Sequence, residues 1–142
     1  MPQTNITILA VDDDLEDLEL IEDCITNLEP SARIIKITDG SKLLSYLNDL
    51  NDGDLPCLII LDYNMPEMNG AEVIGQLAKF PRFESIPKVI FSTSNLSRHI
   101  NESMNNGATG YFVKPNNMKE LNRVGREMLS YCGKNDHAPS GK

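Results

Sequence analysis

Short apolar runs alternate five times with stretches whose apolar residues recur at helical spacing, and this alternation restricts the fold more than any other feature. The expected strands cover residues 6–11, 33–37, 57–61, 88–92 and 110–113. The stretches with helical spacing cover residues 15–28, 43–50, 73–77, 97–106 and 117–131. Strands that alternate with helices predict a parallel sheet with right-handed crossovers and helices on both faces. We therefore expect an α/β protein with a doubly wound parallel sheet.

The third run, residues 57–61, is the most apolar of the five and ends abruptly at Asp62. A continuous run of this kind is typical of a central strand that is buried on both faces. A turn-forming segment, residues 64–70, follows it. Open α/β sheets bind ligands at the carboxyl ends of their strands. On this stretch alone, Asp62 is either a site residue or an ordinary turn or capping residue.

Length and charge restrict the class of protein. The 142 residues correspond to one domain, and the net charge of -8 argues against a nucleic-acid-binding surface. The charge suits a protein that holds a cation or meets a basic partner. No apolar run approaches the roughly 20 residues of a membrane span, and residues 1–5 lack the positive charge of a signal peptide. We expect a cytoplasmic protein that binds neither nucleic acid nor membrane.

The cysteines and histidines give no metal or redox signal. Cys24, Cys57 and Cys132 are odd in number and form no CxxC motif, so we predict three buried, small apolar side chains. His99 and His137 lie far apart in the sequence, and we expect neither to be a metal ligand.

The carboxyl ends of the expected strands bring six polar residues to one rim of the sheet. They are Asp12 and Asp13 after the first strand, Asp62 after the third, Ser92 and Thr93 at the fourth, and Lys114 after the fifth. Three carboxylates at one place repel one another unless a cation joins them. Oxygen ligands without His or Cys point to Mg²⁺. A hydroxyl and an ammonium beside them would complete a site for a phosphoryl group.

The order of these residues resembles the receiver domain of bacterial two-component response regulators. The resemblance covers about residues 6–131 and rests on Val11-Asp12-Asp13, on Leu61-Asp62-Tyr63-Asn64-Met65-Pro66 with Gly70, on Ser92-Thr93 and on Tyr111-Phe112-Val113-Lys114-Pro115. It implies a flavodoxin-like fold with strand order 2-1-3-4-5. It also implies a receiver domain over residues 1–133 and no output domain. Residues 134–142 are small and polar, and we expect them to form a disordered tail.

The resemblance implies a role for each acidic residue of the rim. Asp62 is similar to the phosphoacceptor, whose carboxylate attacks a phosphohistidine. Asp13 is similar to the direct Mg²⁺ ligand, and Asp12 to the residue that holds metal-bound water. Asn64 matches the position whose backbone carbonyl completes the coordination. The implied metal site is therefore Asp12, Asp13, Asp62 and Asn64.

The same resemblance implies a switch. Ser92 is similar to the hydroxyl that binds the phosphoryl oxygen, with Thr93 beside it. Tyr111 matches the aromatic residue that turns inward with this loop. Lys114 resembles the lysine that pairs with Asp62 at rest and with the phosphoryl group after transfer.

Two further positions near the site are the Lys114–Pro115 bond and Asp14. The Lys114–Pro115 peptide bond is cis in the family, which would help to aim the ammonium into the site. Asp14 lies outside the acidic pair that the family uses. We predict that Asp14 is the N-cap of the first helix, since Asp caps well at such a position.

We therefore expect a single-domain response regulator, a signalling domain and not an enzyme. Its phosphoryl donor would be a sensor histidine kinase or a histidine phosphotransfer protein. The fourth helix depends on Ile100 and Met104 for apolar anchoring and is expected to move. The surface of helix four, strand five and helix five would then bind a downstream protein or a second copy, or the phosphoryl group would be relayed. Ser92-Thr93-Ser94 and the short tail resemble stand-alone regulators that serve phytochrome-type kinases.

Two alternatives come from other classes. A phosphatase of the haloacid dehalogenase type also uses an Asp nucleophile, Mg²⁺ and a lysine. It would need its nucleophile on the first strand and a second Asp two residues later, where this chain has Asn64. A nucleotide-binding module would need a Gly-rich loop after the first strand, where this chain has Asp12-Asp13-Asp14.

Overall fold

The computed structural model describes residues 6–136, with side chains to residue 133, and contains one five-stranded parallel sheet. Its order is β2-β1-β3-β4-β5, and every neighbouring pair is parallel. The strands are β1 (Thr7–Val11), β2 (Arg33–Ile37), β3 (Leu58–Leu61), β4 (Lys88–Ser92) and β5 (Gly110–Val113). This flavodoxin-like arrangement confirms the predicted fold class and strand order.

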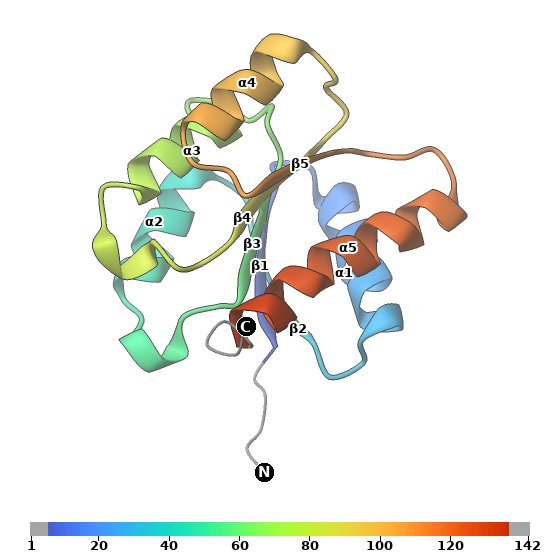
Figure 1. The fold of residues 1–142 in the computed structure, drawn as a ribbon, viewed down its shortest axis with the longest axis horizontal. Coiled ribbons are helices and arrows are strands. Elements are labelled where there is room, and N and C mark those ends of the chain that lie inside the picture. Colours follow the sequence, from blue (N-terminus) through green and yellow to red (C-terminus); the bar gives the residue numbers. More distant parts are fainter. Residues whose placement is uncertain (1–5, 137–142) are drawn as a thin grey trace.

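Five helices cover the two faces of the sheet (Figure 1). They are α1 (Leu15–Leu28), α2 (Gly40–Asn48), α3 (Gly70–Leu77), α4 (Ser97–Asn105) and α5 (Met118–Asp136). Helices α1 and α5 lie on one face, and α2, α3 and α4 on the other. Short 3-10 helices, Asp52–Asp54 and Pro81–Phe83, lie in two of the connections. Within the described part of the chain, no helix is both long and apolar enough to cross a membrane.

Helix α5 continues to Asp136, beyond the end expected near Tyr131. The polar sequence predicted to be disordered from residue 134 is therefore helical as far as Asp136. The rest of that predicted tail, residues 137–142, lies outside the described residues.

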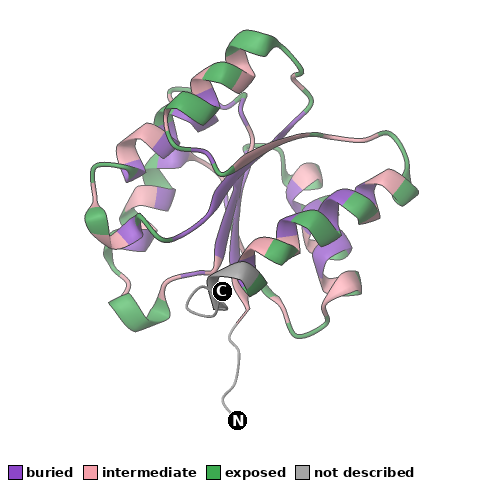
Figure 2. Cartoon of the chain, in the orientation of Figure 1, coloured by how far each residue is buried: buried purple, intermediate pink, exposed green. Residues whose placement is uncertain are grey.

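Strand β3 is buried on both faces, as predicted from its sequence. Ile59 and Leu61 pack into the cluster beneath α2 and α3, and Leu58 and Ile60 into the cluster beneath α1 and α5. All four side chains are fully buried (Figure 2). Because β3 also pairs with β1 and β4, it is a rigid support for the residue that follows it, Asp62.

Side-chain caps explain where three of the helices begin. The Asp14 carboxylate accepts a hydrogen bond from the N–H of Glu16 at 2.9 Å and caps α1, as predicted. Asp39 caps α2 in the same way, and Asn69 caps α3 through a capping box with Glu72. Asp14 therefore serves the helix, and the rim keeps Asp12 and Asp13.

Helix α4 has less apolar anchoring than the sequence suggested. Met104, one of the two residues expected to hold it, is 44% exposed, and Ile100 is only half-buried. The buried residue of this helix is Ser103, whose hydroxyl donates to the carbonyl of His99. Other contacts must therefore hold α4 in place.

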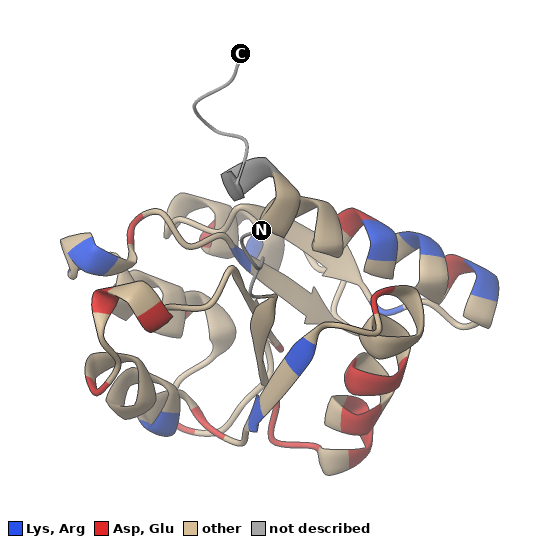
Figure 3. Ribbon diagram, turned by 90° about the horizontal axis from the view of Figure 1, so that it is seen from below, with Lys and Arg blue, Asp and Glu red and all other residues tan. Residues whose placement is uncertain are grey.

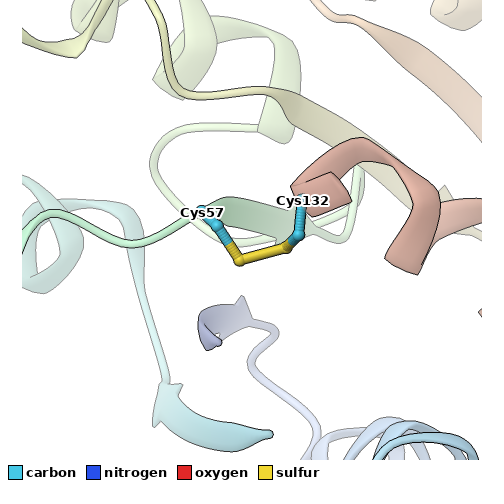
Figure 4. The surroundings of a disulfide bond; sticks show 2 residues. All are labelled: Cys57 and Cys132. Carbon is cyan, nitrogen blue, oxygen red and sulfur yellow. A yellow bond between two sulfur atoms is a disulfide. The ribbon is translucent and has the colours of Figure 1, made fainter. Parts of the chain in front are cut away.

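The prediction for two of the cysteines is wrong. Cys57 and Cys132 form a disulfide, with their Cα atoms 5.0 Å apart (Figure 4). Their separation of 75 residues explains why no short motif announced the pair. Cys24 is free and buried, as predicted.

Gly125 lies in the middle of α5, where glycine weakens a helix by about 1 kcal/mol. The structure supplies a reason for it, because α1 packs directly against this position. A Cβ atom at Gly125 would come within 2.7 Å of Cys24 Sγ and 2.8 Å of Leu28 Cδ1. Gly125 therefore permits the close approach of the two helices.

We predict that Gly125→Ala lowers the free energy of unfolding by about 1–2 kcal/mol, because the clash outweighs the gain in helix propensity. Gly133→Ala is the matched control, since it lies in the same helix and a Cβ atom there meets nothing within 4 Å. That variant should be more stable by up to about 1 kcal/mol. Urea unfolding measures both. Equal stabilisation by the two substitutions would contradict the packing argument.

Candidate functional site

The carboxyl rim of the sheet brings the three predicted acids together. Asp12 follows β1 and Asp62 follows β3, and the pairing of Val11 with Leu61 sets the two acids at the same level. One carboxylate oxygen from each of Asp12, Asp13 and Asp62 lies within 4.8 Å of the others. Asp12 is buried, Asp62 is half-buried and Asp13 is exposed. The cluster is therefore open to solvent on the side of Asp13.

Burial makes this cluster electrostatically costly. It raises the pKa of Asp12 to about 6, although the N–H of Asp14 donates to the Asp12 carboxylate at 3.0 Å. Burial also raises the pKa of Asp62, against the opposing effects of Lys114 and of a hydrogen bond from Ser92. Buried carboxylates with raised pKa values favour either a proton or a cation close by.

The residues present fit a hard divalent cation. The donor atoms are carboxylate oxygens from two strand ends, with no His or Cys among them. Such an oxygen-only set suits Mg²⁺, which is held by one or two carboxylates together with water and phosphate. A cation here would also offset the cost of burying Asp12 and Asp62. Asn64, expected to contribute a backbone carbonyl, is exposed, and its N–H donates to the Asp62 carboxylate.

Lys114 reaches the cluster but is not paired mainly with Asp62. Its ammonium lies 2.9 Å from Asp17 Oδ2 and 3.1 Å from Asp12 Oδ2, and 3.9 Å from Asp62 Oδ1. Burial opposes the charge of Lys114, but its hydrogen bond with Asp17 and the charges of Asp62 and Asp12 outweigh burial and raise its pKa. The Lys114–Asp62 pair, which the resemblance implied for the resting state, is therefore the longest of the three contacts.

Asp17 is the site residue that sequence reasoning missed. It belongs to an acidic helix: α1 carries five acidic residues and no Lys or Arg (Figure 3). Asp17 lies in the first turn of α1, immediately beyond the rim, and its side chain is 33% exposed. The signal in the sequence was an acid in the first helical turn after the Asp12-Asp13 pair. That position also suits a simple interaction with the helix dipole, which made it uninformative.

The backbone around Lys114 differs from what the resemblance implied. The Lys114–Pro115 peptide bond is trans. The register of β5 positions the lysine, because Val113 pairs with Ser92 and the N–H of Lys114 donates to the carbonyl of Ser92 at 2.8 Å. The ammonium therefore reaches the acids without the cis bond.

The two predicted switch residues at the carboxyl end of β4, Ser92 and Thr93, differ in exposure. Ser92 is fully buried, and its hydroxyl bonds the Asp62 carboxylate. Its Oγ also accepts a hydrogen bond from the N–H of Ser94 at 3.2 Å. Thr93 is exposed. The buried hydroxyl therefore links the acid cluster to the loop between β4 and α4.

Tyr63, directly after Asp62, is a second residue that the sequence did not single out. Its hydroxyl donates to Glu102 of α4, and its ring stacks on His99 with centroids 4.0 Å apart. Burial, together with the Glu102 carboxylate, raises the pKa of Tyr63 to about 12. The side-chain N–H of Asn69 donates to the Tyr63 hydroxyl at 3.2 Å. These contacts supply the anchoring that α4 lacks in apolar residues.

The loop before α4 is joined to the same group. Ser94 Oγ lies 2.6 Å from His99 Nδ1 in a hydrogen bond. The hydroxyl of Tyr111 donates to the Ser94 carbonyl at 2.8 Å. Ser94 thus connects Ser92, His99 and Tyr111, so polar contacts run without interruption from the acid cluster to α4.

We predict that Asp12→Asn stabilises the metal-free protein increasingly between pH 4 and 6.5. An acid whose pKa is raised by folding stabilises the folded state fully below its unfolded pKa of 3.8, and this contribution is lost as the pH rises through about 6. The gain of the variant over the wild type should grow by roughly 2–3 kcal/mol across this range. Urea unfolding in a chelator measures it, with Asp54→Asn as control. A pH-independent difference would contradict the prediction.

Comparison with known proteins agrees with this geometry. The family model described as the response regulator receiver domain matches residues 8–124. The chain is 31% identical to the two-component response regulator ARR9 of Arabidopsis thaliana, over 94% of the chain and 63% of that relative, so it spans less than two thirds of the relative's length.

Solved structures with the same fold include two that are 26% identical to this chain. The phosphorylated cyanobacterial phytochrome response regulator RcpA superposes with a TM-score of 0.79, over 89% of this chain and 93% of that one. The Mn²⁺-bound response regulator Rcp1 superposes with a TM-score of 0.75, over 88% and 92%. The chain belongs to the response regulator receiver-domain family, the signalling domains of two-component systems that are phosphorylated on an aspartate.

Proposed function

We propose that this chain is a phosphorylation switch that takes up a phosphoryl group on Asp62 in a Mg²⁺-dependent reaction. The donor would be a phosphohistidine of a sensor histidine kinase or of a histidine phosphotransfer protein. The observation that supports this best is the set of groups around Asp62: two further carboxylates, the Lys114 ammonium and the buried Ser92 hydroxyl. The likeness to a phytochrome response regulator makes a phytochrome-type kinase our preferred donor.

The surroundings of Asp62 suit a nucleophile. Its side chain is 11% exposed, enough to meet a phosphoryl group while β3 holds it in place. Hydrogen bonds from the N–H groups of Tyr63 and Asn64 orient the carboxylate. One carboxylate oxygen attacks phosphorus, the bond from phosphorus to the imidazole nitrogen breaks, and an aspartyl phosphate results. Lys114 stabilises the charge on the transferred group.

The Mg²⁺ ion would be held by Asp12, Asp13, Asp62 and the Asn64 carbonyl. When bound, it supplies positive charge that offsets the negative charge of the phosphoryl group. Burial raises the pKa of both Asp12 and Asp62. A nearby cation would therefore stabilise the ionised form of each of these acids. Because Asp13 is exposed, the cluster is open to solvent on its side, and the phosphoryl group can approach from there.

Lys114 would change partners during the switch. The aspartyl phosphate adds nearly two negative charges beside Asp62, where the ammonium now makes its longest contact at 3.9 Å. We expect the ammonium to move toward the phosphoryl group and away from Asp17. Asp17 would then act as the resting partner of the lysine.

The signal would leave through α4. A phosphoryl oxygen that binds the Ser92 hydroxyl pulls on the loop that carries Ser94, and through Ser94 on His99 and Tyr111. Helix α4, held mainly by polar contacts, is then the element that shifts. The face made of α4, β5 and α5 would change its affinity for a downstream protein or for a second copy.

We predict that Asp62→Asn abolishes phosphoryl uptake, because an amide does not attack phosphorus. Incubation with acetyl phosphate and Mg²⁺, followed by intact mass, measures the fraction phosphorylated. Asp54→Asn, which changes an exposed acid in the short helix Asp52–Asp54, should behave as the wild type. Uptake by Asp62→Asn at the wild-type level would show that the nucleophile lies elsewhere.

We also predict that Tyr63→Phe loosens α4 in the unphosphorylated protein. The substitution removes the hydrogen bond to Glu102 but keeps the ring stacked on His99. Loss of one such bond should speed hydrogen exchange of the α4 amides by about tenfold. Tyr46→Phe on α2, remote from α4, is the control. If α4 exchanges at the same rate in both variants, the Tyr63 contact does not anchor it.

A further inference from the structure

The Cys57–Cys132 disulfide joins two elements that are each positioned by other contacts. Cys57 directly precedes β3, and its N–H donates to the carbonyl of Thr7 at 2.9 Å. Cys132 ends the buried stripe of α5, after Leu121, Val124 and Met128. The Cα atoms are 5.0 Å apart, within the range of about 4.4–6.8 Å that a disulfide requires. Figure 4 shows the bond between the start of β3 and the end of α5.

The two sulfur atoms are therefore preorganised whether or not they are bonded. The β3 strand is fixed by its neighbours β1 and β4, and the inner stripe of α5 is buried against α1 and the sheet. Because these contacts do not depend on the sulfur–sulfur bond, we expect both backbones to keep their positions when it opens. This is the arrangement in which a dithiol and a disulfide can interconvert within one fold.

The third cysteine, Cys24, does not compete with Cys57 or Cys132 for disulfide formation. Cys24 is buried on α1, where its thiol lies 3.6 Å from the carbonyl of Leu121, and burial raises its pKa. It packs beside Gly125, two helical turns before Cys132, or about 10 Å along the axis. A buried thiol of raised pKa reacts slowly, whereas Cys57 is half-buried and is the most exposed of the three cysteines.

We propose that Cys57 and Cys132 form a reversible dithiol–disulfide site that locks the end of α5 onto the start of β3. The oxidant is a low-molecular-weight disulfide of the glutathione class. The Cys57 thiolate attacks one of its sulfur atoms and expels a glutathione thiolate, giving a mixed disulfide. The Cys132 thiolate then attacks the Cys57 sulfur and expels the second. Two electrons pass to glutathione, and the two thiol protons of the protein end on the two glutathione thiols.

The lock acts at the end of the molecule away from the acid cluster. Cys57 and Asp62 stand at opposite ends of β3, about 16 Å apart at strand spacing. The redox state therefore governs how firmly the end of α5 is held against the start of β3, and it leaves the geometry around Asp62 unchanged. Because α5 is part of the proposed output face, the lock would set the stiffness of that face; this last consequence rests on the proposed function.

Thiol trapping tests the site directly. The full chain is equilibrated in glutathione buffers from fully reduced to fully oxidised and then quenched with acid. It is next unfolded without reductant, alkylated, and analysed by intact mass and by peptide mapping. Of the three cysteines, all should be alkylated in the reduced form and Cys24 alone in the oxidised form. Three alkylated cysteines at every ratio, or a bridge that includes Cys24, would overturn the proposal. So would a bond that excess glutathione fails to open in the folded protein.

The locking effect is measured on the same two forms. A bridge across 75 residues restricts the unfolded chain, so the oxidised form should melt roughly 10 °C higher. Its last α5 amides should exchange at least about tenfold more slowly. Cys57→Ser should remove both differences, and Cys24→Ser should retain them, which separates the bridge from a general effect of cysteine loss. Equal melting and exchange in the two forms would overturn the lock.

Phosphoryl uptake from acetyl phosphate completes the test. Because the two sites are far apart, uptake by oxidised and reduced protein should agree within about twofold. A loss of uptake on oxidation would overturn the claim that the lock is local. Absence of uptake in both forms would count against the proposed function, while the thiol, melting and exchange results would still decide the lock.

Discussion

The structure depends on keeping several carboxylates close together at one rim of a buried sheet. Burial raises the pKa of Asp12 and Asp62, so the folded protein carries an electrostatic cost at that point. Lys114 offsets part of it by lying among Asp12, Asp17 and Asp62, and its own backbone is fixed by β4. Because burying these carboxylates is electrostatically costly, the site responds strongly to any added charge. Each new cation or anion changes which ion pairs are favourable.

The rest of the molecule divides into a rigid and a movable part around that rim. The central strand β3 has four fully buried side chains and neighbours on both sides, so it holds Asp62 firmly. Helix α4 has a single buried residue and is joined to the rim through Tyr63 and Ser94 instead. Polar contacts depend on direction and break with small shifts, whereas apolar packing tolerates them. This contrast explains how a local change of charge can move one helix without disturbing the sheet. At the other end of the molecule, the disulfide holds the end of α5 covalently.

Much of this was predictable from sequence, partly from local patterns and partly from the family resemblance. The order of the strands followed from the family resemblance, and the capping role of Asp14 from its position before the first helix. The grouping of Asp12, Asp13 and Asp62 followed from parallel strands ending at one rim. The trans Lys114–Pro115 bond and the length of α5 are local departures, whereas three further contacts that were not foreseen join pairs distant in sequence. Asp17 meets Lys114, Tyr63 meets His99, and Cys57 meets Cys132 only after the chain has folded. None of these residues carries a local signal that names its partner.

The amino-acid sequence by itself therefore determined the α/β class, the central strand and the acidic cluster, because hydrophobic periodicity and strand direction are properties of short segments. Only the tertiary structure decided which partner Lys114 chooses, what anchors α4, and which cysteines bond. Each of these depends on distances of a few ångströms between side chains from different elements. Such distances are set by how helices and strands pack against one another, and a one-dimensional pattern does not contain them.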